Sequence, residues 1–190
     1  KLVTGVQTCA LPICEIGLYY TKHNQHSHSE QARVLRKLLR LAKLRRLPVV
    51  IHCRDEKYCE ESAKDCLQIL QEILHPSHII HRHCFNGSLQ EFRSWQAAFR
   101  NCYFGFTGLV TDLSNRHPDI PAVLKEVGRD RLLLETDSPY LVPKSRKIIT
   151  SVNSPALLHD IAMAVGHYRN VTAGQILLIT CSNAQHCYRI

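Results

Sequence analysis

Two histidines and two carboxylates in this chain combine metal-binding side chains with positions that could bring them together. Each lies in or directly after a strand-like apolar segment, and the four are Glu15, His52, His83 and Asp137. Imidazole nitrogens and carboxylate oxygens suit divalent ions such as Mg²⁺, Mn²⁺ or Zn²⁺. Because one carboxylate could bridge two ions, the set could hold either one or two of them.

Each of these residues also has an ordinary structural explanation. A single histidine at a strand end is often a hydrogen-bonded core residue, and an aspartate before Ser-Pro is often a turn or a helix cap. His81 shares the strand face of His83 and could be a further ligand, although a packing or supporting role is the preferred interpretation. A solvated loop is the preferred interpretation of His23, His26 and His28. Recurrence at successive strand ends nevertheless favours a metal site over four unrelated roles.

Arg54 directly follows the strand that carries His52, and its guanidinium could hold a substrate phosphate. The neighbouring Asp55 could orient the groups around it, and an ordinary salt bridge is the competing interpretation of both residues. The formal net charge of +8 fits a polyanionic partner. Much of that charge lies on one expected helix at residues 30–46, where a solvated basic face explains it equally well.

Hydrophobic periodicity predicts strands that alternate with helices. The expected strands span residues 15–20, 49–53, 78–85, 102–107 and 132–134. The expected helices span residues 30–46, 56–74, 89–100, 120–127, 155–165 and 173–188. The spacing of Val34, Leu38 and Leu41 is typical of an amphipathic helix, whereas the β-branched run at 49–53 is typical of a strand buried on both faces.

This alternation predicts an α/β fold, in which a parallel sheet is covered by helices on its outer face. We expect the strands to follow one another in sequence order through right-handed crossovers. The chain contains neither a GxGxxG nor a GxxxxGK[ST] phosphate loop. In a (β/α) barrel the active site lies at the carboxyl ends of the strands, where the candidate ligands are expected.

Composition places the chain among soluble globular proteins, with 45% hydrophobic and 21% charged residues over 190 positions. No apolar run reaches the roughly 20 residues that a membrane span needs. The nine cysteines form no CxxC pair, so a zinc finger is excluded and a disulfide scaffold is not expected. We therefore expect an intracellular protein that acts in the cytoplasm or the nucleus.

The first thirteen residues are expected to be foreign to the protein. The string VTGVQTCALPI at positions 3–13 matches the translation of a sequencing adapter residue for residue. The next adapter base would also convert a glycine codon at position 14 into the observed Cys14. We therefore treat residues 1–13 as an artefact and residues 14–190 as a hydrolase domain that lacks its natural N-terminal part.

Several motifs, in order along the chain, resemble those of the TatD family of metal-dependent deoxyribonucleases. They are EIGL at 15–18, LPVVIHCRD at 47–55, HCFNGS at 83–88, YFGFTG at 103–108 and LLLETDSPYLVP at 132–143. The HRHCF form at 81–85 is most similar to the eukaryotic branch, and CSNA at 181–184 is similar to the closing TxNA helix of the family.

The resemblance implies a partial TIM-like barrel of the metallo-dependent hydrolase type, with its first strands missing. It implies hydrolysis of phosphodiester bonds in DNA, taken single-stranded or at its ends, with two divalent ions in the full-length protein. Matched residue by residue, Glu15, His52, His83 and Asp137 correspond to metal ligands. Asp137 also corresponds to the catalytic aspartate, and we expect Arg54 to bind the substrate phosphate.

The chain departs from the family pattern at two places. No HxH motif precedes Glu15, and Tyr19 stands where the family usually has an aspartate. Tyrosine carries no carboxylate, so a non-catalytic nucleic-acid-binding remnant is one alternative. The other alternative is an amidohydrolase that acts on small molecules with the same barrel. Cleavage of single-stranded DNA would separate a nuclease from both.

Overall fold

The computed structural model describes residues 12–56, 59–112, 117–144 and 151–190. Most of the adapter-like segment at 1–13 therefore lies outside the described residues, although Ile13 already belongs to the first strand. The chain divides into two compact units. The first comprises residues 1–81, 94–102 and 184–190, and the second comprises residues 82–93 and 103–183.

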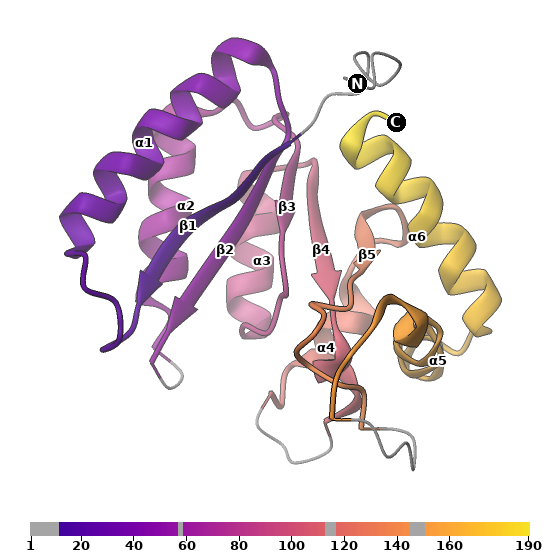
Figure 1. Cartoon of the computed structure of the whole chain (residues 1–190). Coiled ribbons are helices and arrows are strands. Elements are labelled where there is room, and N and C mark those ends of the chain that lie inside the picture. Colours follow the sequence, from indigo (N-terminus) through magenta and orange to yellow (C-terminus); the bar gives the residue numbers. More distant parts are fainter. Residues whose placement is uncertain (1–11, 57–58, 113–116, 145–150) are drawn as a thin grey trace, which may run out of the picture. The chain divides into compact units, whose positions relative to one another are not determined.

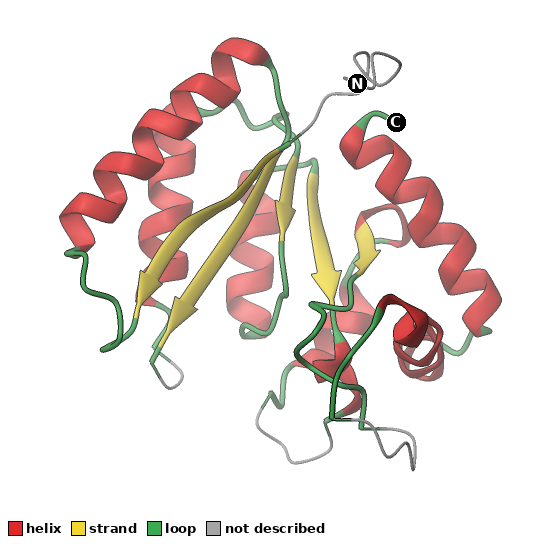
Figure 2. Ribbon diagram, in the orientation of Figure 1, coloured by secondary structure: helices red, strands yellow, loops and turns green. Residues whose placement is uncertain are grey.

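Among the described residues, five strands alternate with helices and the last two of the six α-helices follow one another, as the periodicity predicts (Figures 1 and 2). The strands are β1 (Ile13–Tyr20), β2 (Val49–Asp55), β3 (Ile80–Arg82), β4 (Cys102–Phe106) and β5 (Leu132–Leu134). The helices are α1 (His28–Arg45), α2 (Glu61–Ile73), α3 (Leu89–Ala98), α4 (Ile120–Glu126), α5 (Leu158–Arg169) and α6 (Ala173–Tyr188). Short 3₁₀ turns lie at Gly108–Thr111, Arg129–Arg131 and Pro155–Leu157.

The strand order β1-β2-β3-β4-β5 follows the sequence, and the pairs β1–β2 and β4–β5 are parallel. The predicted parallel α/β architecture is thus confirmed. Among the described residues, no helix is both long and apolar enough to cross a bilayer.

In the first unit, α1 and α2 pack against β1 and β2 (Figure 1). The buried side of β1 carries Ile16 and Leu18, which lie opposite the buried α1 residues Leu35 and Leu39. Because strand side chains alternate, Glu15, Gly17 and Tyr19 lie on the other face of β1. The helix packing therefore decides which face of the strands is available for chemistry.

Helix α1 begins at His28, two residues before its expected start. Ser27 is the N-cap, and it exchanges hydrogen bonds with Glu30 in a capping box. The Ser-x-x-Glu pattern that produces this cap is present in the sequence. The earlier start follows from the cap, which satisfies the first free N–H groups of the helix.

In the second unit, an aromatic cluster supports the parallel pair β4–β5. The rings of Phe85 and Phe104 lie 5.3 Å apart edge to face, and Phe92 and Phe106 pack against Phe85.

Asn183, in the CSNA motif, donates hydrogen bonds to the carbonyls of Arg129 and Leu132. The motif that resembles the closing family helix thus holds the start of β5.

Several expected boundaries were wrong, among them that of the helix expected at 155–165, which is a 3₁₀ turn at Pro155–Leu157 followed by α5 at Leu158–Arg169. The strand expected at 78–85 is only Ile80–Arg82, because Cys84 adopts a left-handed backbone conformation with φ 46° that ends the extended run. The helix expected at 56–74 begins at Glu61, six residues after the end of β2 at Asp55. Asp55 then accepts hydrogen bonds from both the backbone N–H and the hydroxyl of Ser62, at 2.9 and 2.6 Å.

Candidate functional site

Glu15 and His52 lie on neighbouring parallel strands of the first unit. A carboxylate oxygen of Glu15 and a ring nitrogen of His52 lie within 4.8 Å of each other. The β1–β2 register shifts between Ile13 and Ile16, so Glu15 lies in an irregular part of the strand, where its side chain is exposed. The two side chains are therefore close enough for both to bind one ion.

The close approach of β1 to β2 at this place requires a glycine. Gly17 pairs with His52 across the strands. A Cβ atom at Gly17 would lie 1.7 Å from the carbonyl oxygen of His52, far inside any permitted contact. The glycine of the EIGL motif thus allows the Glu15 strand to lie against the His52 strand.

Tyr19 and Arg54 continue the same face toward the carboxyl ends of β1 and β2. The rings of Tyr19 and His52 are stacked, with centroids 6.5 Å apart and an interplanar angle of 19°. The guanidinium carbon of Arg54 lies 5.7 Å from the centroid of the Tyr19 ring. Arg54 is exposed. Its charge is therefore accessible to a ligand at the strand ends.

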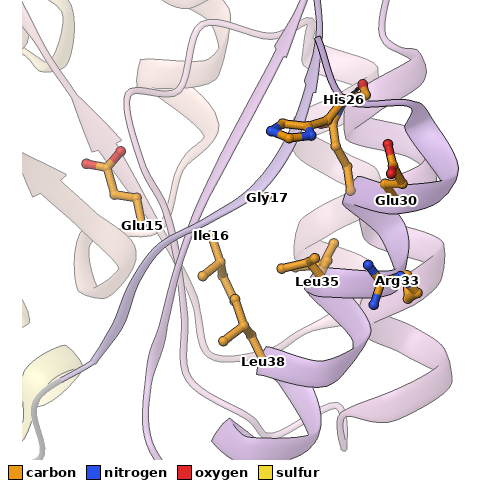
Figure 3. A pocket seen from close by; sticks show the side chains of 10 residues that line it. Glu15, Ile16, Gly17, His26, Glu30, Arg33, Leu35 and Leu38 are labelled. Atoms are coloured by element: carbon orange, nitrogen blue, oxygen red, sulfur yellow. Dashed lines mark hydrogen bonds between the residues drawn. The ribbon is translucent and has the colours of Figure 1, made fainter. Parts of the chain in front are cut away.

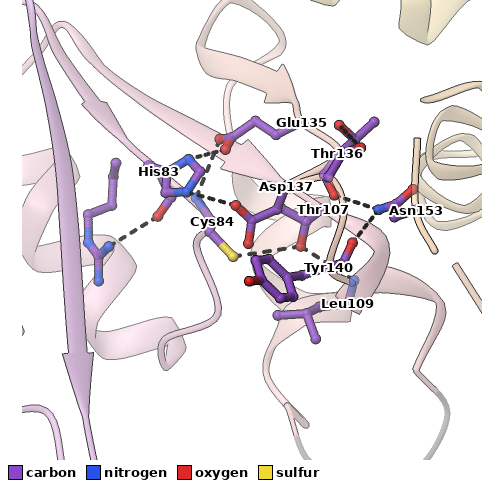
Figure 4. Close-up of polar contacts among 11 residues, drawn as sticks. His83, Cys84, Thr107, Leu109, Glu135, Thr136, Asp137, Tyr140 and Asn153 are labelled. Carbon is purple, nitrogen blue, oxygen red and sulfur yellow. Dashed lines mark hydrogen bonds and ion pairs between the residues drawn. The ribbon is translucent and has the colours of Figure 1, made fainter. Parts of the chain in front are cut away.

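His83 and Asp137 come together in the second unit. His83 Nε2 lies 3.5 Å from Asp137 Oδ1, and His83 Nδ1 contacts a carboxylate oxygen of Glu135 (Figure 4). Only 10% of the His83 side chain and 12% of the Glu135 side chain are exposed, against 33% for Asp137. Glu135 thus holds the His83 ring through Nδ1, and Nε2 faces Asp137.

Glu135 was not among the predicted site residues, although it belongs to the ETD sequence at 135–137. A carboxylate that accepts a hydrogen bond from Nδ1 selects the tautomer whose Nε2 can bind a metal. Glu135 Oε1 also accepts a weak bond of 3.4 Å from the backbone N–H of Cys84. Its place in the structure is that of a residue that orients His83.

The backbone of Asp137 is held by Asn153, which the sequence reasoning missed. Asp137 is in the left-handed region with φ 56°. The buried amide of Asn153 donates to the carbonyls of Thr136, Tyr140 and Leu141, at 2.7, 2.6 and 3.1 Å (Figure 4). Main-chain acceptors leave no trace in composition, so no sequence signal pointed to Asn153.

Cys84 lies beside His83, but it is not suited to act as a nucleophile. Burial raises the pKa of the Cys84 thiol to about 12, and the nearby Glu135 carboxylate adds to the shift. Its sulfur contacts the Thr107 hydroxyl at 3.8 Å. The thiolate form is therefore scarce near neutral pH, and hydrolysis through a covalent cysteine intermediate is disfavoured.

The other histidines named from the sequence have separate surroundings. His81 is buried, and its Nδ1 lies 2.5 Å from the Tyr188 hydroxyl, in agreement with a packing role. His28 stacks on Tyr20, with ring centroids 3.5 Å apart. His26 borders a cavity of about 480 Å³ between β1 and α1, which also includes the apolar side chains of Ile16, Leu35 and Leu38 (Figure 3).

The Glu15 carboxylate is directed away from Ile16 and Leu38 in this view (Figure 3). The cavity therefore lies on the helix-facing side of β1, whereas the carboxylate belongs to the opposite face. Glu15 is one of the residues that line the cavity, although its carboxylate is not directed toward the apolar side chains there.

The comparison with protein families matches the model described as TatD related DNase to residues 6–189. The chain belongs to this family. It is 34% identical over 179 residues to the uncharacterized metal-dependent hydrolase YabD of Bacillus subtilis, covering 94% of this chain and 65% of that protein. It is 32% identical over 188 residues to the 3′-5′ ssDNA/RNA exonuclease TatD of Shigella flexneri, covering 98% and 68%.

A third relative is the human 3′-5′ RNA nuclease TATDN2, which is 33% identical over 135 residues, or 71% of this TatD-family chain and 17% of that protein. The chain thus spans about two thirds of the bacterial relatives and a small part of the human one.

Solved structures of TatD homologues share the fold. The hydrolase of the family from Entamoeba histolytica has a TM-score of 0.76 at 25% identity, covering 93% of this chain and 62% of that one. The TatD homologue YJJV from Escherichia coli has the same TM-score at 22% identity, covering 95% and 64%. The α/β fold is therefore that of TatD homologues, consistent with a partial TIM-like barrel.

Proposed function

We propose that this protein hydrolyses phosphodiester bonds of single-stranded nucleic acid in a reaction that depends on divalent metal. The observation that carries the proposal is the family match over residues 6–189 together with the close ligand pair Glu15–His52. The Shigella relative is named a ssDNA/RNA exonuclease and the human one an RNA nuclease. These names favour a nucleic acid over the small-molecule substrate of an amidohydrolase, and they extend the expected substrate from DNA to RNA.

We propose Glu15, His52, His83 and Asp137 as the metal ligands. The donor set fits a divalent ion, since it combines two imidazole nitrogens with two carboxylates in close pairs, and Glu135 orients one imidazole. Mg²⁺, Mn²⁺ and Zn²⁺ are the candidates, with two ions in the full-length protein. When bound, such an ion would supply positive charge that polarises the phosphoryl oxygen.

Asp137 is the proposed proton acceptor for the water that attacks phosphorus. Its side chain is one-third exposed, so water can reach it, and Asn153 fixes the backbone on both sides of it. A carboxylate that points at the attacking water can orient it and accept its proton. Glu135 keeps the His83 ring directed toward Asp137, and Arg54 binds the phosphate that is cleaved.

We also propose that the protein acts inside the cell, in the cytoplasm or the nucleus. The cysteines of the described residues are free thiols, which agrees with a reducing compartment.

The test is cleavage of a 5′-labelled single-stranded oligonucleotide, as DNA and as RNA, by the protein in the longest form that its gene encodes. We expect cleavage with Mg²⁺ or Mn²⁺, its loss with chelator, and at least a hundredfold loss of kcat in D137N. The 190 residues cover 65% and 68% of two bacterial relatives, so this chain is tested beside that form. E126Q, on the remote helix α4, is the matched control and should cleave normally.

Binding of the oligonucleotide without turnover, in protein that has bound metal, would contradict the proposal in favour of the non-catalytic remnant. Hydrolysis of amide or lactone substrates with no effect on the oligonucleotide would favour the amidohydrolase.

A further inference from the structure

We infer that Tyr19 positions Arg54 to bind a phosphate group of the nucleic acid beside the Glu15–His52 ligand pair. This inference rests on the proposed function, because it assigns the contact that holds the substrate. Tyr19 and Arg54 together form the Tyr19–Arg54 pair.

The two residues face each other in the strand register. Tyr19 on β1 pairs with Arg54 on β2, two positions beyond the pairing of Gly17 with His52. The guanidinium carbon of Arg54 lies over the Tyr19 ring at 5.7 Å from its centroid, within the range of a cation–π contact. Register and side-chain contact therefore agree on the same partner.

The backbone of Tyr19 is fixed more firmly than a strand end requires. Its N–H donates to Gln31 Oε1 at 2.7 Å, and its carbonyl accepts from the side-chain amides of Gln31 and Asn24, at 3.1 and 2.9 Å. These three bonds connect the end of β1 to α1 and to the loop before it. They fix the backbone from which the ring extends, and stacking on His52 restrains the ring itself.

Contact with an aromatic ring leaves the edges of a guanidinium available. Arginine has five N–H donors in one plane, and stacking uses the face of that plane and not its donors. Phosphate oxygens accept such donors in pairs, which makes the contact both strong and directional. An exposed guanidinium that is kept in one orientation by an aromatic ring is therefore suited to a phosphodiester.

The identity of residue 19 decides whether Arg54 is available. An aspartate at this position would lie opposite Arg54 and bind its guanidinium as an ion pair, in competition with phosphate. Tyrosine holds the guanidinium without neutralising it. Among the residues that the structure describes, no carboxylate forms an ion pair with Arg54.

The Tyr19–Arg54 pair is also next to the proposed metal ligands. The Tyr19 ring is stacked on the ring of His52, 6.5 Å away, and His52 lies within 4.8 Å of Glu15. A phosphate bound by Arg54 would therefore lie on the same face of the two strands as the ligand pair, with the Tyr19 ring between Arg54 and His52. Tyr19 thus contributes to substrate binding through Arg54.

The experiment measures binding of a fluorescein-labelled ten-nucleotide oligo-dT by anisotropy, in the presence of chelator, so that neither metal binding nor cleavage contributes. The variants are Y19F, Y19L, Y19D, R54Q and the double variant Y19L/R54Q. We expect Y19L to weaken binding about two- to fivefold, as loss of one exposed cation–π contact would. Y19D should weaken binding further. Y19F should bind as wild type does, because the phenylalanine ring keeps the contact with the Arg54 guanidinium.

The double variant gives the decisive comparison. If Tyr19 acts through Arg54, Y19L has no further effect once R54Q is present. R40Q, which removes an exposed arginine of α1, controls for general charge and should weaken binding less than R54Q. Additive effects of Y19L and R54Q, or equal losses in R40Q and R54Q, would overturn the inference. If Y19L and R54Q have non-additive effects on binding but the cleavage assay of the proposed function shows no metal-dependent cleavage, only the proposed function is overturned.

Discussion

The position of Asp137 depends on one buried side chain. Asn153 is 3% exposed and donates to three carbonyls in the segment that contains Asp137. Removal of such a donor leaves buried carbonyl oxygens without a hydrogen bond. Each unsatisfied carbonyl lowers the free energy of unfolding by about 1–3 kcal/mol. The left-handed backbone of Asp137 is retained because this network holds the residues before and after it.

We therefore expect N153A to lower the free energy of unfolding by about 1–3 kcal/mol and to reduce kcat more than KM. Urea denaturation and steady-state cleavage of the oligonucleotide measure the two effects. N170G, at the exposed C-cap of α5, is the control that should leave kcat unchanged. Normal kcat in folded N153A would show that Asp137 does not depend on this amide.

His78 gives the fold a dependence on pH. Burial lowers the pKa of His78 below its usual 6.5, although a hydrogen bond from Nε2 to the Leu47 carbonyl at 2.9 Å opposes the shift. The unfolded chain then binds a proton at a higher pH than the folded chain does. The contribution of His78 to the free energy of unfolding is therefore fully present above about pH 6.5. It is lost as the pH falls through the lowered pKa of His78 in the folded protein.

The measurement is the free energy of unfolding of wild type and of H78Q at a series of pH values from mildly acidic to mildly alkaline, since a glutamine side chain cannot titrate. We expect the stability of wild type to fall more steeply below about pH 6.5 than that of H78Q. Parallel curves for the two proteins would contradict the assignment, because carboxylates titrate identically in both.

The pairing of β1 with β2 is the feature on which the Glu15–His52 pair depends. Gly17 lies where a Cβ atom would meet the His52 carbonyl at 1.7 Å, and that atom is backbone, which cannot move aside alone. A side chain at this position must separate the strands or shift their register. Either change moves Glu15 away from His52.

We expect G17A to lower the free energy of unfolding by about 1–3 kcal/mol and to weaken Mn²⁺ binding at least tenfold. Urea denaturation and Mn²⁺ titration measure the two effects. G174A, at a glycine on α6 whose Cβ would meet nothing closer than 3.9 Å, is the matched control. Tight Mn²⁺ binding by G17A would show that the close approach of the strands is not needed.

The strand elements could be predicted from sequence because the buried runs are continuous and end at polar residues. This predicted β2 and β5 and, through them, the positions of His52 and Asp137. The end of β3 could not be predicted, because it depends on the left-handed backbone of Cys84, and cysteine gives no signal for that conformation. The capping box of α1 was readable in the Ser-x-x-Glu spacing.

Across the chain as a whole, the sequence names candidate ligands, whereas it does not name the residues that orient them. Glu15, His52, His83 and Asp137 follow from residue type, strand position and resemblance to the family, and their roles as ligands remain predictions. Glu135 and Asn153 act through a histidine ring and through main-chain carbonyls, and such partners are set by the folded backbone. The residues that orient the candidate site can therefore be identified only from the folded structure.

Mn²⁺ titration of the 190-residue chain, followed by the electron paramagnetic resonance signal of the free ion, tests the ligand set most directly. We expect wild type to bind Mn²⁺, and E15Q, H52Q, H83Q and D137N each to weaken binding at least about tenfold. The control variants E126Q and H159Q change exposed residues, and both should bind Mn²⁺ as wild type does. Equal Mn²⁺ affinity in wild type and all four ligand variants would contradict the account.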